Sequence, residues 1–307
     1  MTIRHSIGSV RARSLIPAAA ITLCLLTSAQ AQQTYKTPDE AASALADAVK
    51  SGSERNILKV LGSNGQDIVS SGDDVADKES RERFTTAWDA KHSIKTEGDK
   101  KAVMILGNDD FPFPIPLTKN KAGWEFDTSA GRLEILYRRI GRNELDAIQT
   151  SLAYVDAQNE YAEKDRGAGT GVYAQRIVST SGKKDGLYWP GDDSPLGELA
   201  AQAAGEGYKV GQGPIPYHGY YFRILTQQGS NAPGGELNYV VKGKMIGGFA
   251  LLAWPAEYGN SGVMTFQVNH NGVVYQKDLG DYTATLVKRI TRFDPDQTWK
   301  KVDAAKP

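Results

Sequence analysis

The chain has few residues that could do acid–base, nucleophilic or metal chemistry. Three of its four histidines, His92, His218 and His270, lie beyond residue 31, and its single cysteine is Cys24. No two of these histidines have the spacing of a helical zinc pair, and a thiolate ligand is available only near the N-terminus. We therefore expect no zinc site and no cysteine nucleophile.

Ser261 and Glu257 are the polar residues of a glycine-rich stretch, "GGFALLAWPAEYGNSG", that stands out in the C-terminal half. Ser261 precedes a glycine in "GNSGV", but this is not the G-x-S-x-G elbow that places a nucleophile between a strand and a helix. Glycine and serine supply turn geometry, so we predict a turn here. We predict no catalytic residue.

Three pairs of aspartates offer carboxylates, and each pair lies beside a glycine or in a turn context. Aspartate commonly bonds its own local backbone in turns, so we predict solvated turns. Paired carboxylates for glycoside hydrolysis need a separation of about 5–10 Å, which a sequence does not supply. A hydrolase that uses Asp192 or Glu257 therefore stays open as an alternative. The pairs are Asp73-Asp74, Asp109-Asp110 and Asp192-Asp193.

Aromatic residues are dense in the C-terminal part of the chain, and two interpretations are open. Tyr, Phe and Trp favour strands and fill sheet cores, but Tyr and Trp also anchor ligands and partners at exposed surfaces. Polar contacts from a histidine and an arginine would complete such a surface. The candidate surface consists of Tyr188, Trp189, His218, Arg223, Trp254 and Tyr258.

The elements that would position these residues form an α+β fold. Thr37 and Ser53 are predicted N-caps of two helices, and a third helix is predicted over residues 77–92. The segments "KAVMIL", "FPFPIPLT" and "GWEFDT" predict a small antiparallel meander. The prolines of the middle segment predict an edge strand or an extended ribbon, because proline cannot donate to a ladder. We predict an N-terminal domain over residues 32–128.

A long helix is predicted from about residue 132, with Gly141 as a bend or break, and it begins a second domain over residues 129–307. An irregular segment with a short helix near 195–204 follows. "GYYFRILTQQ", "GGFALLAWPA", "GVMTFQV" and "GVVYQKDL" predict an antiparallel sheet against which the long helix packs. Asn271-Gly272 predicts a tight hairpin turn.

The N-terminus predicts export. Residues 1–31 contain three arginines and no acid, then an apolar run that ends in Ala29-Gln30-Ala31, the pattern of a cleaved signal peptide. Removal of these residues leaves 33 of the 36 basic residues against 36 acidic ones, a net charge of −3. The mature chain would begin at Gln32, contain no cysteine and have no second run long enough to span a bilayer. We expect a periplasmic protein that binds no nucleic acid.

Several long phrases carry a resemblance to a known family. "NDDFPFPIPL", "IGRNELDAIQ", "DGLYWPGDDSPLG" and "PYHGYYFRILTQQG" resemble the domain-of-unknown-function 2950 family of exported bacterial proteins. That family implies no activity. Residues 132–290 are also similar to the soluble domain of type II secretion pseudopilins, which implies a pseudopilin-like helix, loop and sheet. Pseudopilins bind calcium, so a calcium site at Asp165, Asp192 or Asp193 stays open, with no other cofactor expected.

The sequence therefore predicts an exported envelope protein that acts as a binding or interaction module without catalysis. Its partner would be an unknown envelope protein or polymer. The alternative is a hydrolase acting on an envelope polymer or glycan.

Overall fold

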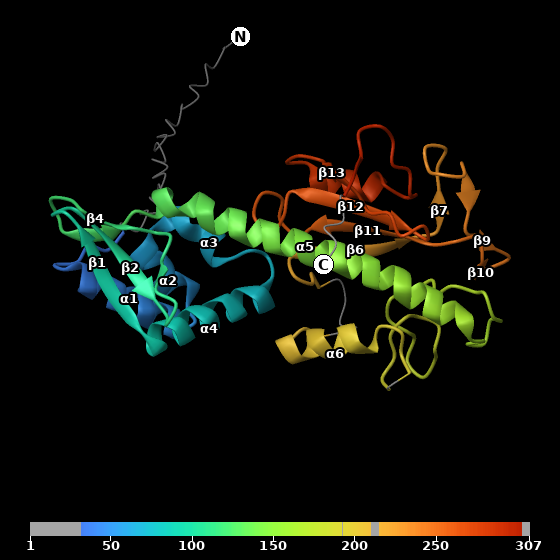
Figure 1. The fold of residues 1–307 in the computed structure, drawn as a ribbon, viewed down its shortest axis with the longest axis horizontal. Helices are drawn as coiled ribbons and strands as arrows, with labels where there is room; N and C mark the ends of the chain where they lie inside the picture. Colours follow the sequence, from blue (N-terminus) through green and yellow to red (C-terminus); the bar gives the residue numbers. More distant parts are fainter. Residues whose placement is uncertain (1–31, 192, 210–214, 303–307) are drawn as a thin grey trace, which may run out of the picture.

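The computed structural model describes residues 32–191, 193–209 and 215–302. The predicted signal peptide and Asp192 lie outside the described residues. Figure 1 shows an N-terminal half and a C-terminal half that lie along one long helix. Each half has its own cluster of buried apolar side chains. The predicted α+β architecture is confirmed.

The N-terminal half begins with helices whose caps match the sequence pattern. The Thr37 hydroxyl accepts a hydrogen bond from the Glu40 amide at 3.1 Å, and the Ser53 hydroxyl accepts one from the Asn56 amide at 3.4 Å. The predicted third helix starts three residues early, because Asp73 caps it. The helices are α1 (Pro38–Lys50), α2 (Glu54–Leu61), α3 (Gln66–Val69) and α4 (Asp74–Ala90).

The N-terminal sheet is antiparallel in the order β1-β2-β4-β5, and β3 also pairs with β2. The proline-rich segment was expected to be an edge strand or an extended ribbon. Pro112 lies in β3, whose one partner among the described strands is β2, while Pro114 and Pro116 lie between β3 and β4 and belong to no strand. Only β4, the end of the segment, lies inside the sheet, between β2 and β5. This placement keeps the prolines, which lack an N–H group, out of the interior of the ladder. β1, a polar edge strand, was not predicted. The strands are β1 (His92–Glu97), β2 (Lys101–Leu106), β3 (Phe111–Pro112), β4 (Leu117–Lys119) and β5 (Trp124–Phe126).

The long helix α5 (Thr128–Glu163) contains 36 residues and joins the two halves. It runs through Gly141 without the expected break. Ile135, near its start, packs against the N-terminal core, whereas Tyr154 and Val155 belong to the C-terminal core. One helix therefore carries side chains of both cores, and Figure 1 shows it running along both halves.

The C-terminal sheet is antiparallel throughout, in the order β14-β13-β12-β11-β6, which confirms the prediction. Gln267 pairs with Tyr275, so the connection around Asn271-Gly272 is longer than the predicted tight hairpin. The helix α6 (Gly197–Glu206) stands apart from the sheet (Figure 1). The main strands are β6 (Tyr220–Leu225), β11 (Ala250–Pro255), β12 (Met264–Asn269), β13 (Tyr275–Asp278) and β14 (Lys300–Lys301).

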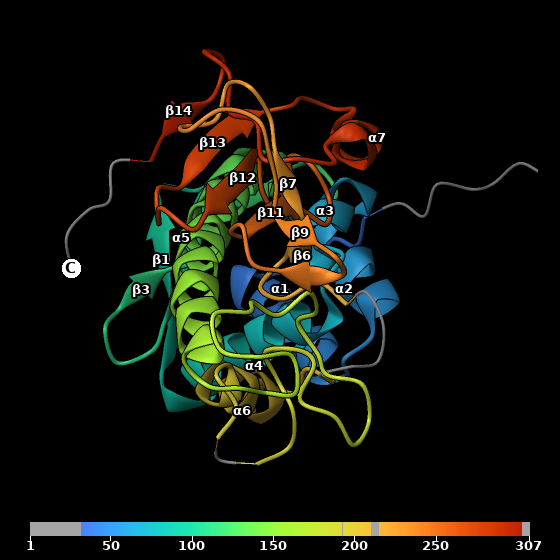
Figure 2. The same ribbon diagram turned by 90° about the vertical axis from the view of Figure 1, so that its right-hand side faces the viewer.

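Smaller elements complete the C-terminal half. Two short strand pairs and two short helical turns flank the main sheet, and α7 is visible at its edge in Figure 2. These elements are β7 (Gln227–Gln228), β8 (Leu237–Asn238), β9 (Val240–Val241), β10 (Lys244–Met245), α7 (Thr283–Leu286) and a 3-10 turn over Val287–Arg289; the N-terminal half has a 3-10 turn over Ser63–Gly65.

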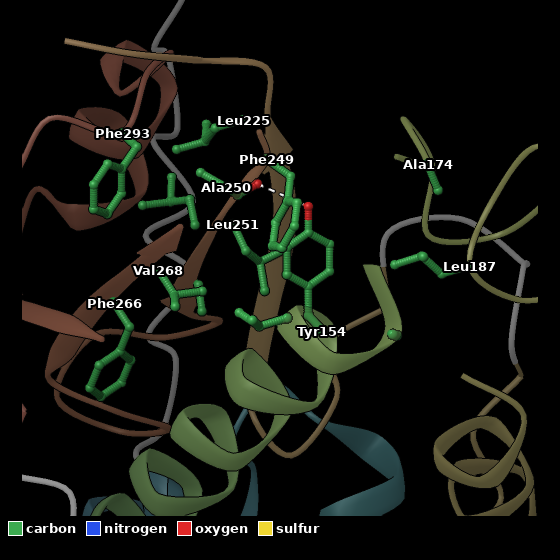
Figure 3. Packing of buried hydrophobic residues seen from close by; sticks show 14 of the residues in the cluster. Tyr154, Ala174, Leu187, Leu225, Phe249, Ala250, Leu251, Phe266, Val268 and Phe293 are labelled. Carbon is green, nitrogen blue, oxygen red and sulfur yellow. Dashed lines mark hydrogen bonds between the residues drawn. The ribbon is translucent and has the colours of Figure 1, made fainter. Parts of the chain in front are cut away.

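The C-terminal core fixes α5 on the sheet. Figure 3 shows Tyr154 of α5 directed at Phe249 and Ala250 of the sheet side. The Tyr154 hydroxyl donates to the Ala250 carbonyl at 3.2 Å, and its ring meets Phe249 edge to face at 5.6 Å between centroids. Within the described residues, no helix combines the length and apolar character needed to cross a membrane.

Candidate functional site

A cavity of about 450 Å³ lies where α6, α5 and the C-terminal sheet face one another. We call it the α6 cavity. Its volume falls in the range of small-molecule sites. Its walls come from five separate parts of the chain: Thr150, Tyr154, Ile177, Val178, Tyr188, Leu196, Leu199, Ala200, Ala203, Tyr208, Lys209, Ile215, Pro216, Tyr217, Tyr221, Phe222, Leu251 and Trp254.

The side chains on the facing elements explain why the α6 cavity is open. α6 turns the small side chains of Ala200 and Ala203 toward the cavity, at the i, i+3 spacing of one helix face. Across from them, Tyr221 of β6 and Trp254 of β11 are paired in register, and their rings lie 5.7 Å apart. Cross-strand aromatic pairs of this kind stabilise a sheet face. A wall of rings therefore faces a wall of methyl groups.

The lining is chemically uniform. Among the described residues of the lining, polar side-chain atoms come only from the tyrosine hydroxyls, the Trp254 indole N–H, Thr150 and Lys209. The Tyr154 hydroxyl is bonded to a carbonyl, and the Tyr208 hydroxyl donates to Asp73 at 2.9 Å. These hydroxyls are therefore engaged in the fold. The cavity is suited to apolar and aromatic contacts.

His218 fastens α6 at one end of the cavity. Its Nδ1 lies 2.8 Å from Asp146 of α5, and its Nε2 lies 2.7 Å from Glu206 of α6. Burial alone would lower the pKa of His218, but the hydrogen bonds and charges of both carboxylates outweigh burial and raise that pKa to about 9. Its ring lies 4.2 Å from that of Tyr217, which lines the cavity.

The protonated ring therefore donates from both nitrogens and has no free lone pair. A general base needs such a lone pair. His218 is thus placed to hold α6 on α5 through its two carboxylate partners.

Asp73, at the start of α4, bonds the N-terminal half to the segments that follow α6 and precede β6. One carboxylate oxygen caps α4 through the amides of Val75 and Ala76. The other oxygen accepts from the Tyr208 hydroxyl at 2.9 Å and from the Gly219 amide at 2.8 Å. Asp73 is 1% exposed, so its predicted place in a solvated turn is wrong. A buried carboxylate needs these several donors to be stable.

Asp109, Asp110 and Asp193 are exposed, in agreement with solvated turns, and Asp192 lies outside the described residues.

Four of the six residues of the candidate surface gather around the α6 cavity. Tyr188 and Trp254 line it. The Arg223 guanidinium lies 5.3 Å from the centre of the Trp254 ring and donates to two carbonyls behind it. His218 bonds α5 to α6 at one end of the cavity.

The other two residues lie elsewhere. Trp189 is 5% exposed and packs in the core against Tyr161, with its indole N–H donated to Asp193 at 2.8 Å. Tyr258 forms a β-bridge with Gly262, in the turn after β11. Neither lines the cavity. Sequence reasoning missed Tyr154, Tyr208 and the α6 alanines, for which only the small-residue spacing of α6 was a signal.

Ser261, in the glycine-rich stretch of the C-terminal half, is part of a turn, as predicted. Ser261 is fully buried, and its hydroxyl accepts from the Glu257 amide at 2.9 Å and donates to the Glu257 carbonyl at 3.2 Å. The Glu257 carboxylate accepts from the Asn260 side-chain amide at 2.8 Å. These bonds order the chain between β11 and β12.

The described part of the chain contains no cluster of three or more His, Cys, Asp or Glu side chains arranged to hold a metal ion. Asp165 accepts from the amides of Gly167 and Gly169, both at 2.8 Å, as in a local turn. Asp193 accepts from Lys184 and Trp189.

The fold and the cavity define a class: a two-part α+β protein with an apolar, aromatic cavity in its C-terminal half. The chain belongs to the family described as protein of unknown function (DUF2950), whose model matches residues 32–302. The family resemblance read from the sequence is thereby confirmed. Neither the curated proteins nor the solved structures gave a match, so the likeness to pseudopilins is not confirmed.

Proposed function

We propose that this protein is exported to the periplasm and there binds a neutral, apolar molecule in the α6 cavity, without catalysis. The observation that carries this proposal is the cavity itself, with rings on one wall and alanines on the other. Burial of apolar ligand surface stabilises a complex by about 25 cal/mol per Å² before the costs of association. An aromatic wall adds stacking contacts.

A neutral ligand is favoured over a charged one. Among the described residues of the lining, Lys209 is the only ionisable side chain other than tyrosines, and it is exposed. The charges of His218, Asp146 and Glu206 at the end of the cavity are paired with one another, and the guanidinium of Arg223, beside Trp254, donates to two carbonyls. An ionic headgroup inside would lose its water without gaining a partner.

The test is a fluorescence titration of the mature chain with N-phenyl-1-naphthylamine, a neutral apolar dye. Ala203→Phe fills the cavity from α6, and Ala204→Phe is its matched control, because Ala204 is exposed on the same helix. We expect Ala203→Phe to weaken dye binding at least about fivefold, since its ring takes the space of the dye and overpacking costs about 1–3 kcal/mol. Ala204→Phe should leave binding unchanged.

Equal dye affinity in the two variants would contradict the proposed site. Melting curves of both variants confirm that each is folded. Leu199→Trp, from the same face of α6, serves as a second filling variant.

Export is supported by two observations. The family match starts at residue 32, where signal cleavage is expected to leave the mature chain. The Gln32 side chain donates to the carbonyls of Val60 and Phe126 at 3.0 and 2.7 Å, so this residue is already part of the fold. Sequencing the N-terminus of protein from a periplasmic extract should give Gln32; retention of residues 1–31 would refute export with cleavage.

A further inference from the structure

A second cavity, of about 460 Å³, lies in the N-terminal half between α4 and α5. We call it the α4–α5 groove. Its floor consists of apolar side chains from α1 and α2, among them Leu45, Val49 and Ile57. Figure 1 shows α4 opposite the first part of α5, on the side away from the C-terminal sheet. The α4–α5 groove is therefore separate from the α6 cavity.

The rim of the groove is basic because each helix turns one polar face to it. α4 contributes Arg81 and Arg83, and α5 contributes Arg138, Arg139 and Arg142. On α5, Arg142 lies three and four residues after Arg139 and Arg138, the spacing of one helix face. Five arginines stand against two lining aspartates, Asp77 and Asp109.

Three of the five arginines already have partners. Arg83 pairs with Glu79 at 2.5 Å, and Arg138 bonds Glu134 at 2.6 Å, each along its own helix. Arg139 donates to the carbonyls of Asp67 and Ile68.

Arg81 and Arg142 remain. The Nη1 atom of Arg81 is buried and has no hydrogen-bond partner in the described structure. Arg142 belongs to none of the ion pairs found among the described residues. Burial and then the charge of Arg83 lower the pKa of Arg142, and they outweigh the charges of Asp146 and Glu79, which raise it. Arginine donors beside an apolar cavity suit a planar, doubly accepting anion such as a carboxylate.

We propose that the α4–α5 groove binds a single-chain amphiphile with an acidic headgroup, a fatty acid, with its chain on the apolar floor and its carboxylate at Arg81 and Arg142. The volume is that of a small-molecule site, which favours one chain over a two-chain lipid. The carboxylates near Arg142 already have partners: Asp146 bonds His218 and Glu79 pairs with Arg83. Asp77 accepts from the Ser71 amide at 2.9 Å and forms no ion pair among the described residues. This site stands independently of the neutral ligand in the α6 cavity.

The test uses cis-parinaric acid, a fluorescent fatty acid, and its methyl ester, titrated into the mature chain. We expect the acid to bind at least about tenfold more tightly than the ester, because a hydrogen bond to a charged group contributes about 1.5–3 kcal/mol. Arg81→Gln and Arg142→Gln should each remove most of that difference. Arg55→Gln is the matched control, since Arg55 is an exposed arginine of α2 outside the groove.

Ala87→Leu narrows the apolar part of the groove and should weaken both acid and ester. Ala203→Phe, in the other cavity, should leave acid binding unchanged. The proposal is overturned if acid and ester bind equally, if neither binds, or if Arg142→Gln binds the acid as tightly as Arg55→Gln does. Loss of acid binding in Ala203→Phe alone would place the acid in the α6 cavity and also overturn it.

Discussion

At the scale of single residues, His218 decides how α6 is held. It gains two carboxylate partners on folding, and its folded pKa of about 9 lies above the ordinary value of 6.5. A raised pKa means that the folded state binds the proton more tightly than the unfolded chain does. The resulting stabilisation is therefore complete below pH 6.5 and is lost as the pH rises through about 9.

We predict that His218→Gln destabilises the protein near pH 6 by about 1–2 kcal/mol, after allowance for partly exposed carboxylates. The difference from the unmutated chain should shrink as the pH rises to about 10, where the histidine is neutral. Urea unfolding at both pH values measures it. A difference that stays constant over this range would show that His218 is not held as a cation.

Asp73 and Asp74 are adjacent in sequence but have different roles. Asp73→Ala should destabilise the protein by about 2–4 kcal/mol, because it removes an N-cap and leaves the Tyr208 and Gly219 donors without their acceptor. Asp74→Ala should cost less than about 1 kcal/mol, since Asp74 is exposed and contributes mainly to the helix dipole. Chemical denaturation of both variants tests this. Equal losses of unfolding free energy would contradict the role given to Asp73 as the acceptor for Tyr208 and Gly219.

Neighbouring residues can have quite different surroundings, and this is what the sequence could not predict for single side chains. Tyr188 lines the α6 cavity, whereas Trp189, the next residue, is packed in the core. From residue type alone, Tyr188 and Trp189 are equally good candidates for a core or for a binding surface. The sequence does not say toward which of these each side chain is directed. Asp73 likewise has the turn context of the other acid pairs, and only its distant partners make it structural.

At the scale of elements, α5 contains two glycines in opposite surroundings. A Cβ at Gly141 would meet no atom within 4 Å, whereas a Cβ at Gly131 would lie 2.5 Å from the Pro114 carbonyl oxygen and 2.6 Å from the Ile115 Cα. Gly131 therefore allows the helix to approach the N-terminal sheet closely.

We predict that Gly141→Ala stabilises the protein by about 0.5–1 kcal/mol through helix propensity and lower entropy of the unfolded chain. Gly131→Ala should destabilise it by about 1–3 kcal/mol through overpacking. Thermal unfolding of the pair tests this. Destabilisation by Gly141→Ala would indicate that α5 is bent or broken at that position, as the sequence alone had indicated.

Local signals predicted most elements, since caps, periodicity and turns act over a few residues. Thr37 and Ser53 cap helices as expected, and the C-terminal strands pair antiparallel. β1 was missed because its residues are mostly exposed and polar at a sheet edge, and such a strand carries no apolar alternation. The interior position of β4 was missed because the neighbours of a strand are set by the fold of the whole sheet and not by its own residues.

At the scale of the whole molecule, two cores share one helix, and each half carries its own cavity. The α6 cavity is built from α5, residues 177–188, α6, β6 and β11, so no single stretch of sequence contains it. The junction of Asp73, Tyr208 and Gly219 connects the α6 region to the N-terminal half. Distant parts of the chain must therefore fold together before either proposed ligand can bind at its site.

The most direct test of the central claim is photo-crosslinking with a neutral benzophenone probe, followed by peptide mapping of the mature chain. We predict label on peptides that contain α6, β6 and β11, and less label in Ala203→Phe than in Ala204→Phe. Label spread evenly over the surface, or unchanged when the cavity is filled, would contradict binding in the α6 cavity.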